Sequence, residues 1–523
     1  MLFYMGRVLA LSCYRFRFIL FISLSFSTFI MTILYHKRVH VLKRSTVPVT
    51  TYVYTSAVYY AESENRNKYD SETNSKHSYP MYHEDQIPMP LIDLTANKTN
   101  NCAYFPKVNH LKFNNIYWQI MSADNGLNVY MYSAYYDNRT ILKNNAMVRI
   151  IVMISKPLKQ IDTYCNLWSE NKELKVGKVF SLHKLSPTYP APLYPYLITC
   201  AVPKEWRAAN IIPAAVSLVN HKCGSATNLL RVINNIPPKG QEKNGIAVCI
   251  KGLDFANKDI SVYLVEWLEL LFTMGVDKVT MYEYALHPNI SRVVRHYQDI
   301  GLVELIPLTL PGEAPNVPTL RHRYLDTSDS NHIYVNQILN EKIPFNDCFY
   351  RNMNLFEYIS VLDYDEIIIP KVAYDWGEMM KKIKYKSRIS AYQFWRVVVL
   401  NHTDNRSNLD KTIPNYMYIL KNIHRSKIYE INPKSIYTTE RALVLSTHVA
   451  KFCLTERIGY YKCFFKKINP DIAHVLHFRN SCKEGQEAFC GLDKTVKDKE
   501  VRKYQQVLVD RVSKVLKNQR FIK

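Results

Sequence analysis

Apolar runs alternate with amphipathic segments through the middle of this chain. Residues 245–250 (GIAVCI) form a continuous apolar run, typical of a strand buried on both faces of a parallel sheet. Residues 259–274 follow with apolar side chains at helical spacing, and Gly275 ends the segment. This alternation predicts an α/β fold with a mostly parallel sheet. The further expected elements are strands at 279–282, 302–307 and 358–362 and helices at 290–297 and 336–354.

The flanking regions have different patterns. Residues 102–235 contain short β-like runs, such as 146–153 and 196–202, with turns between them. A Pro-Pro-Lys-Gly segment at 237–240 predicts a domain boundary. Residues 501–516 have the spacing of a basic amphipathic helix, which most often packs one face on its own domain and less often binds a partner or a membrane surface.

An uncharged apolar segment lies near the N-terminus, at residues 18–35. Eighteen helical residues span roughly 27 Å, just enough to cross a bilayer core. The segment ends in Tyr-His-Lys-Arg instead of a small-residue cleavage site, which favours an uncleaved signal anchor over a cleaved signal peptide. Basic residues lie on both sides, so the flanking charge does not fix the orientation. The polar residues 36–100 suit a flexible stalk.

Sequons and cysteines place the large C-terminal part in the secretory lumen. Of eleven cysteines, Cys13 precedes the apolar segment, and the other ten are an even number that suits disulfides in an oxidising compartment. Cys482 and Cys490 are near enough in sequence to close a short loop. The sequence contains no C-x-x-C pair of the kind that binds structural zinc. Five Asn-x-Ser/Thr sequons give modest further support, at Asn97, Asn138, Asn289, Asn401 and Asn405.

These patterns divide the chain into six parts. The expected parts are a cytosolic tail (1–17), a transmembrane signal anchor (18–35), a stalk (36–100), a β-rich luminal region (101–240), a catalytic domain (241–490) and a basic C-terminal helix (491–523). The net charge of +23 would suggest nucleic-acid binding for a cytosolic protein, but a protein in the secretory lumen does not encounter nucleic acid. Acidic glycans, anionic lipid headgroups or a nucleotide diphosphate are the more plausible partners of this charge.

Carboxylates interrupt the apolar pattern at the end of the predicted strand 358–362. Asp363, Asp365 and Glu366 follow that strand, and another apolar run, 367–369, comes directly after them. Buried carboxylates are costly unless something neutralises them, and Mg²⁺ or Mn²⁺ would do so while also binding phosphate oxygens. D-x-D is often only a solvated turn, but ligands of parallel α/β sheets bind beyond the carboxyl ends of strands. The segment therefore predicts a metal–diphosphate site.

Several motifs then resemble, in order, those of glycosyltransferase family 92, formerly a family of unknown function. The resemblance spans roughly residues 102–482. It departs mildly from the family at Phe478, where members typically have tyrosine. The motifs are YSAYYDNR at 132–139, YCNLW at 164–168, VEWLEL at 265–270, NDCFYRN at 346–352, VLDYDEIIIP at 361–370 and HFR at 477–479.

The resemblance implies a GT-A-type fold and inverting sugar transfer from a nucleotide donor, commonly UDP-galactose. It also implies a type II Golgi membrane protein, anchored by the N-terminal helix, that acts on a glycan acceptor. Mn²⁺ (or Mg²⁺) would be held by Asp363 and Asp365, and the alternative for Asp363 is a contact with the ribose or with a metal-bound water. His477 is the candidate third ligand, with a core histidine as the equal alternative. Arg479 would contact the diphosphate, with a structural ion pair as the equal alternative.

Inverting transfer also requires a general base for the acceptor hydroxyl. Glu366 adjoins the metal pair and is assigned to catalysis with Asp365, although strand alternation would turn Glu366 away. Asp254, after the first strand, is expected at the uridine or ribose. His448 is a reserve metal ligand. The weaker candidates are Asp375, Glu378 and Glu440 as bases, Trp376 and Trp395 as acceptor contacts and Asp347 as a structural residue.

Two other functions compete with a metal-dependent glycosyltransferase. A catalytically inactive relative that binds glycans or scaffolds a Golgi complex is the main alternative, although an intact D-x-D-E speaks against it. A secretory metal phosphoesterase would need further Asp/His clusters, which the sequence lacks.

Overall fold

The computed structural model describes residues 102–523 except 124, 188, 238–239, 326–330, 384–386, 401–411 and 480–495. All of these lie in one of the two compact units of the chain, Tyr79–Lys523. Over the described residues, no helix is long and apolar enough to cross a membrane. The predicted tail, signal anchor and stalk lie outside the described residues, as do Cys13, Cys482, Cys490, Asn97, Asn401 and Asn405.

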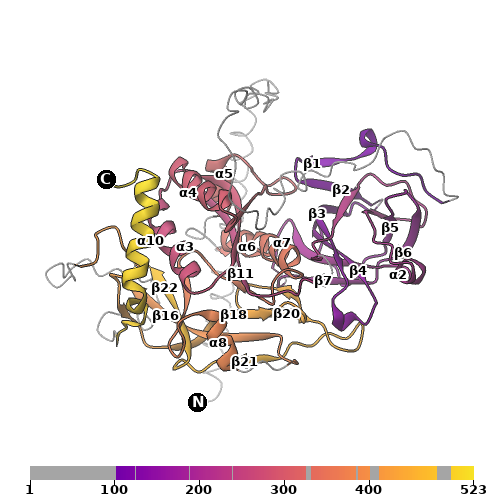
Figure 1. The fold of residues 1–523 in the computed structure, drawn as a ribbon. Coiled ribbons are helices and arrows are strands. Elements are labelled where there is room, and N and C mark those ends of the chain that lie inside the picture. The colour runs from indigo at the N-terminus through magenta and orange to yellow at the C-terminus, as the bar shows by residue number, and fades with distance from the viewer. Residues whose placement is uncertain are drawn as a thin grey trace, which may run out of the picture. The chain divides into compact units, whose positions relative to one another are not determined.

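A ten-stranded sheet forms the first part of the described chain (Figure 1). Its strands are β1 (Phe113–Asn115), β2 (Trp118–Ser122), β3 (Asn128–Asp137), β4 (Met147–Ile154), β5 (Tyr164–Trp168), β6 (Leu174–Lys178), β7 (Ser181–Lys184), β8 (Tyr194–Ala201), β9 (Ala215–Val219) and β10 (Leu230–Ile233). The order is β6-β5-β9-β10-β3-β4-β8-β7, with β1 on β2 and β2 on β3. The pairing is antiparallel except between β10 and β3. The expected β-rich pattern is therefore present here.

An eleven-stranded sheet follows, in the order β13-β12-β11-β14-β18-β16-β17-β23, with β22 joining β15 to β16 and β21 on β16. Its strands are β11 (Ile246–Phe255), β12 (Lys278–Leu286), β13 (Val303–Pro307), β14 (Tyr358–Val361), β15 (Glu366–Pro370), β16 (Ala391–Leu400), β17 (His424–Arg425), β18 (Tyr429–Thr438), β21 (Phe465–Lys467), β22 (Ala473–Arg479) and β23 (Val496–Lys497). A separate hairpin pairs β19 (Ala442–Leu445) with β20 (Ala450–Cys453).

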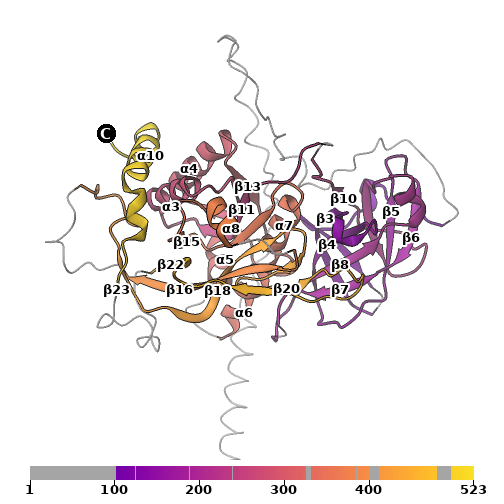
Figure 2. The same ribbon diagram turned by 60° about the horizontal axis from the view of Figure 1, so that its bottom comes forward.

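The expectation of a mostly parallel sheet is corrected to a mixed one. The strands β13, β12, β11 and β14 are parallel, in the order 3-2-1-4 that begins a Rossmann-type sheet. Beyond β14, the strand β18 runs antiparallel to both β14 and β16, and β22 is parallel to β16 but antiparallel to β15 (Figure 2). The sequence predicted the first part because its strands alternate with helices. The remaining strands pair across long loops, which leave no such signal.

The described helices are α2 (Lys204–Ala208), α3 (Ser261–Thr273), α4 (Pro288–Asp299), α5 (Pro318–Leu325), α6 (Asn331–Asn340), α7 (Lys342–Asn352), α8 (Trp376–Ile383) and α10 (Gln505–Asn518), with 3₁₀ turns η2 (Val108–His110), η3 (Thr140–Leu142) and η6 (Glu500–Tyr504). The helices α3 to α7 connect the parallel strands, and α7 packs between the two sheets. Every residue of α7 is buried, and its apolar side chains share one core with residues of both sheets. The expected single helix or helix pair at 336–354 is thus the pair α6 and α7.

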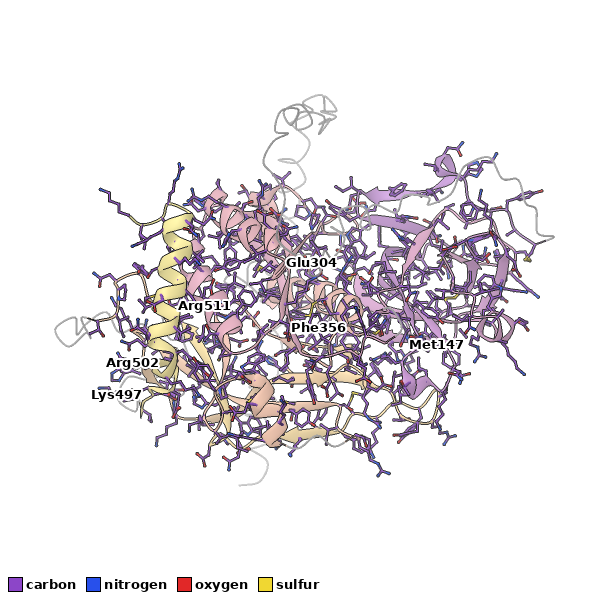
Figure 3. The ribbon with its side chains drawn as sticks, viewed as in Figure 1. Met147, Glu304, Phe356, Lys497, Arg502 and Arg511 are labelled. Atoms are coloured by element: carbon purple, nitrogen blue, oxygen red, sulfur yellow. A yellow bond between two sulfur atoms is a disulfide. The ribbon has the colours of Figure 1, made fainter. Side chains whose placement is uncertain are left out.

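The C-terminal helix packs on α3, beside the second sheet. Leu508, Val512 and Leu516 of α10 are wholly buried in the core that also contains α3. Arg511 of α10 donates to Glu269 of α3 at 2.6 Å (Figure 3). The interpretation as a helix that packs on its own domain is confirmed for this face of α10.

Four disulfides link the described cysteines, which confirms the expectation of disulfides. The pairs are Cys102–Cys223, Cys165–Cys200, Cys249–Cys348 and Cys453–Cys463. Cys249–Cys348 ties β11 to α7, so it joins the first strand of the second sheet to the buried helix.

Candidate active site

The predicted carboxylates form a tight turn between β14 and β15. The backbone N–H of Glu366 donates to the carbonyl of Asp363 at 3.0 Å, and the N–H of Asp363 donates to Glu366 Oε2 at 3.2 Å. The turn exposes 29% of the Asp365 side chain but only 1% of Glu366. Asp365 therefore faces the solvent-filled side of the turn, whereas Glu366 points into the protein.

Strand pairing brings the late H-F-R motif to this turn. Glu366 of β15 lies opposite His477 of β22, and the N–H of Phe478 donates to the carbonyl of Asp365 at 2.8 Å. His477 Nε2 lies 3.5 Å from Asp365 Oδ2, and His477 Nδ1 lies 3.5 Å from Glu366 Oε1. Arg479 Nε lies 3.4 Å from His477 Nε2. Two motifs far apart in sequence thus meet in one site.

Basic residues neutralise the buried carboxylates. Lys251, at the end of the apolar part of β11, lies 2.9 Å from Asp363 Oδ1. Lys434 of β18 is wholly buried and lies 3.0 Å from Asp363 Oδ2 and 2.5 Å from Glu366 Oε2. Arg396 of β16 lies 3.7 Å from Glu366 Oε1. Both oxygens of Asp363 therefore contact lysines.

These contacts set the ionisation of the site. Burial alone would raise the pKa of Asp363, but the charges of Lys251 and Lys434 hold it well below its ordinary value. Burial opposes the charged form of Lys434, yet Asp363 and Glu366 raise its pKa above the ordinary value. Burial, with the nearby charges of Lys434 and Arg396, lowers the pKa of His448 to about 4. Asp363 is thus ionised, and His448 neutral, at neutral pH.

The turn opens into a cavity of about 880 Å³. Asp365, His477 and Arg479 line it, as do Lys251 and His448. Its volume is within the range of pockets that bind small ligands. The cavity is therefore large enough for an extended substrate.

A smaller cavity of about 220 Å³ adjoins it, because Lys251, Gln337 and Tyr364 line both. Asp254 lines the smaller cavity and accepts a 2.8 Å bond from Arg321. Its Oδ2 is buried without a hydrogen-bond partner in the described structure. Asp254 is thus near the predicted site but in a separate recess.

Two of the three predicted metal ligands, Asp365 and His477, lie close together. Two ligands of one small ion lie about 3 Å apart when each bond is about 2.1 Å, close to the 3.5 Å between Asp365 and His477. Asp363 is engaged by its lysines instead. Within the described part of the chain, no group of three His, Cys, Asp or Glu side chains is spaced to hold an ion. An ion held by Asp365 and His477 would need its remaining ligands from a substrate, such as phosphate oxygens, and Arg479, which donates to His477 Nε2 at 3.4 Å, would have to move aside.

A family comparison agrees with the geometry. A profile of Glycosyltransferase family 92 matches residues 244–516, more than half of the chain. This protein belongs to glycosyltransferase family 92. The match includes the turn, β22 and α10.

Comparisons with individual proteins add little to the family 92 assignment. A comparison with curated proteins gives no match. Among solved structures, TarS 1–349 of S. aureus matches at 12% identity and TM-score 0.18, over 37% of this chain and 47% of its own, so the family 92 chain spans about half of it. HddC of Yersinia pseudotuberculosis matches at 12% and 0.22, over 45% and 93%. The mannosyltransferase Ktr4p of S. cerevisiae matches at 9% and 0.19, over 32% and 44%. TM-scores this low do not establish a shared fold.

Two of the motifs that suggested family 92 are structural. Asp347 of α7 accepts hydrogen bonds from Ser133 and Tyr135 of β3, at 2.6 and 2.5 Å, from Tyr282 of β12 at 2.6 Å and from Arg351 at 2.7 Å. The interpretation of Asp347 as a structural residue is confirmed, since it pairs with Arg351. The motifs at 132–139 and 346–352 therefore hold the two sheets together.

The weaker catalytic candidates of the family 92 chain do not line the large cavity. Asp375 accepts from the N–H of Glu378 at 2.7 Å, and Glu378 pairs with Lys382. Glu440 accepts from the N–H of Ile141 at 2.5 Å. Trp376 and Trp395 are buried.

Three basic residues of the site were not predicted from the sequence: Lys251, Arg396 and Lys434. Lys251 had a signal, because it follows the apolar run 245–250 at the same edge of the sheet as Asp363. Arg396 and Lys434 lie on antiparallel strands that no pattern placed beside β14.

Proposed function

We propose that this protein is a metal-dependent, inverting glycosyltransferase of GT-A type that transfers a hexose, most plausibly galactose from UDP-galactose, to a glycan in the Golgi. The observation that supports it best is the meeting of the Asp363–Glu366 turn with His477 and Arg479 at the rim of a large cavity. Family membership supports sugar transfer. The donor sugar and the Golgi location rest on the resemblance and on the signal-anchor pattern.

In this proposal, Asp365 and His477 would hold Mn²⁺ or Mg²⁺, and the positive charge of that ion would offset the charge that develops on the leaving diphosphate. Arg479 and Lys251 line the same cavity and add positive charge for the diphosphate. Asp254 binds the ribose or uracil from the smaller cavity, since its buried Oδ2 accepts no hydrogen bond in the described structure and lies 3.8 Å from His322 Nδ1. Asp363 is positioned by its lysines to shape the turn.

The reaction replaces one bond at the anomeric carbon by another. The acceptor hydroxyl oxygen bonds to this carbon from the face opposite the diphosphate, the carbon–oxygen bond to the diphosphate breaks, and UDP leaves with the electron pair. The hydroxyl proton passes to a base. Glu366 was the sequence candidate, but its short contact with Lys434 favours a positioning role.

The proposal is tested by offering the full-length protein a panel of UDP-sugars with Mn²⁺ or with EDTA. UDP-galactose should be hydrolysed or its galactose transferred, and EDTA should abolish this. Turnover that survives both EDTA and Asp365→Ala would refute the metal site. Glycan binding without turnover of any donor would instead favour the alternative, a catalytically inactive relative that acts as a scaffold. Phe478, which stands where family members typically have tyrosine, is the feature that supports this alternative.

A further inference from the structure

One wall of the large cavity is built of aromatic rings. Tyr263 of α3, Tyr416 and Tyr418 of the segment before β17, and Phe478 of β22 all line it. The rings of Tyr263 and Tyr418 meet edge to face at 5.4 Å, and those of Tyr418 and Phe478 at 6.0 Å. These four side chains are called the aromatic wall below.

The wall is held in place from behind. Glu266 of α3 accepts the backbone N–H groups of Tyr418, Ile419 and Leu420 at 2.6, 2.9 and 3.0 Å. The Tyr416 hydroxyl lies 2.7 Å from Ser513 Oγ of α10. Such fixed rings lose little entropy when a ligand packs on them. The wall is therefore preorganised for binding.

The wall also offers an unsatisfied polar group. The Tyr263 hydroxyl is buried and has no hydrogen-bond partner in the described structure. Buried hydroxyls are normally paired, so this one calls for a ligand hydroxyl or water.

We infer that the aromatic wall is the acceptor subsite, where a hexopyranose unit of the acceptor glycan stacks on Tyr418 and Tyr416 and hydrogen-bonds to Tyr263. One face of a pyranose carries C–H groups that pack on aromatic rings, while its rim carries hydroxyls. The nucleoside has a separate recess at Asp254, with Phe255 and Tyr284. This inference rests on the proposed function, because it needs a donor site beside the wall.

The test uses the full-length protein in detergent with Mn²⁺. Ligand-observed NMR measures binding of methyl β-D-galactopyranoside, methyl α-L-fucopyranoside and methyl N-acetyl-β-D-glucosaminide, and calorimetry measures binding of UDP. Tyr418→Ala should weaken the best pyranoside by about tenfold, whereas Tyr418→Phe, which keeps the ring, should change it by less than about threefold. UDP affinity should stay the same. Tyr460→Ala is the matched control, since Tyr460 is 51% exposed and does not line the cavity.

Three results would overturn the inference. They are wild-type protein that binds none of the pyranosides, unchanged pyranoside binding in Tyr418→Ala, and an equal loss of UDP affinity, which would place the nucleobase on the wall. Should Tyr418→Ala lower the thermal midpoint, Tyr416→Ala is judged by the same criteria. Pyranoside binding at the wall without any sugar transfer would refute the proposed function and with it the acceptor role, and would leave the wall as a glycan-binding site.

Discussion

Lys434 joins two of the carboxylates that the sequence placed in the site. Its ammonium is wholly buried between Asp363 and Glu366. An ion pair in such an environment is costly to break, because the remaining charges lose both water and partner. Lys434 and Glu366 therefore act together as a support for the turn that presents Asp365.

Replacing this lysine should cost stability as well as activity. Lys434→Met keeps the volume but leaves Asp363 and Glu366 without their shared cation, so we expect a loss of about 3–5 kcal/mol in the free energy of unfolding. Chemical denaturation measures this loss. The exposed Lys517→Met should change it by less than about 0.5 kcal/mol. Equal stability of both variants would contradict the support role.

The carboxylates were predictable from the sequence, whereas Lys434 was not. Three acidic residues at the end of an apolar run stand out in any sequence, because burial makes them costly. A lysine in the segment INPKSIY has no comparable signal. Its role depends on β18 lying beside β14, a contact between residues about seventy positions apart.

At the scale of elements, strand pairing completes the site. The antiparallel pair β15–β22 sets Glu366 opposite His477, so this register places the histidine at the turn. The helices α3 and α4 and the strands β12 and β13 followed from local periodicity. The β15–β22 pairing could not, since its strands are separated by β16 to β21.

The C-terminal helix gives a matched pair of variants. Leu508 of α10 is wholly buried and its neighbour Val507 is 43% exposed. Leu508→Ala should lower the free energy of unfolding by about 2–5 kcal/mol, because it leaves a cavity against α3. Val507→Ala should change it by less than about 0.5 kcal/mol. Thermal or chemical denaturation compares the two, and similar effects would mean that α10 does not pack through this face.

A buried histidine between β7 and β20 predicts a pH dependence. His183 packs on the rings of Phe452 and Tyr461. Burial, and secondarily the charge of Arg149, lowers its pKa from 6.5 to about 4. The unfolded chain therefore binds a proton that the folded chain does not between pH 6.5 and 4, so folding stability falls as the pH falls through this window.

His183→Phe should remove this part of the pH dependence. Relative to the wild type, the variant should gain up to about 3 kcal/mol in stability between pH 6.5 and 4. Denaturation curves at a series of pH values test it, with the exposed His110→Asn as control. A difference between variant and wild type that stays constant over this range would contradict the assignment.

At the scale of the whole molecule, one buried carboxylate links the two sheets. Asp347 accepts hydrogen bonds from Ser133 and Tyr135 of the first sheet and from Tyr282 of the second. Arg139 of the first part donates to the carbonyls of Thr439 and Ala442. The sequence identified the motifs at 132–139 and 346–352, but only the fold shows that Asp347 of the second binds Ser133 and Tyr135 of the first.

Loss of this carboxylate should unfold both sheets together. Asp347→Ala leaves three hydroxyls unpaired and leaves Arg351 with the more distant Glu304, at 3.9 Å, so we expect a loss of about 3–5 kcal/mol. Asp471→Ala is the control, since its side chain is 87% exposed. Hydrogen exchange resolves the sheets, and we expect β3 and β12 to lose protection equally. Selective loss in β3 would mean that the sheets fold independently.

The central claim is that the turn at Asp365, facing His477, is the donor site of a glycosyltransferase. The most direct test measures galactose release from UDP-galactose by the full-length protein with Mn²⁺, comparing wild type, Asp365→Asn and Asp471→Asn. We expect Asp365→Asn to lose at least about a hundredfold in rate, while the exposed control equals the wild type. Equal rates in all three proteins would contradict the assignment of Asp365 to the donor site.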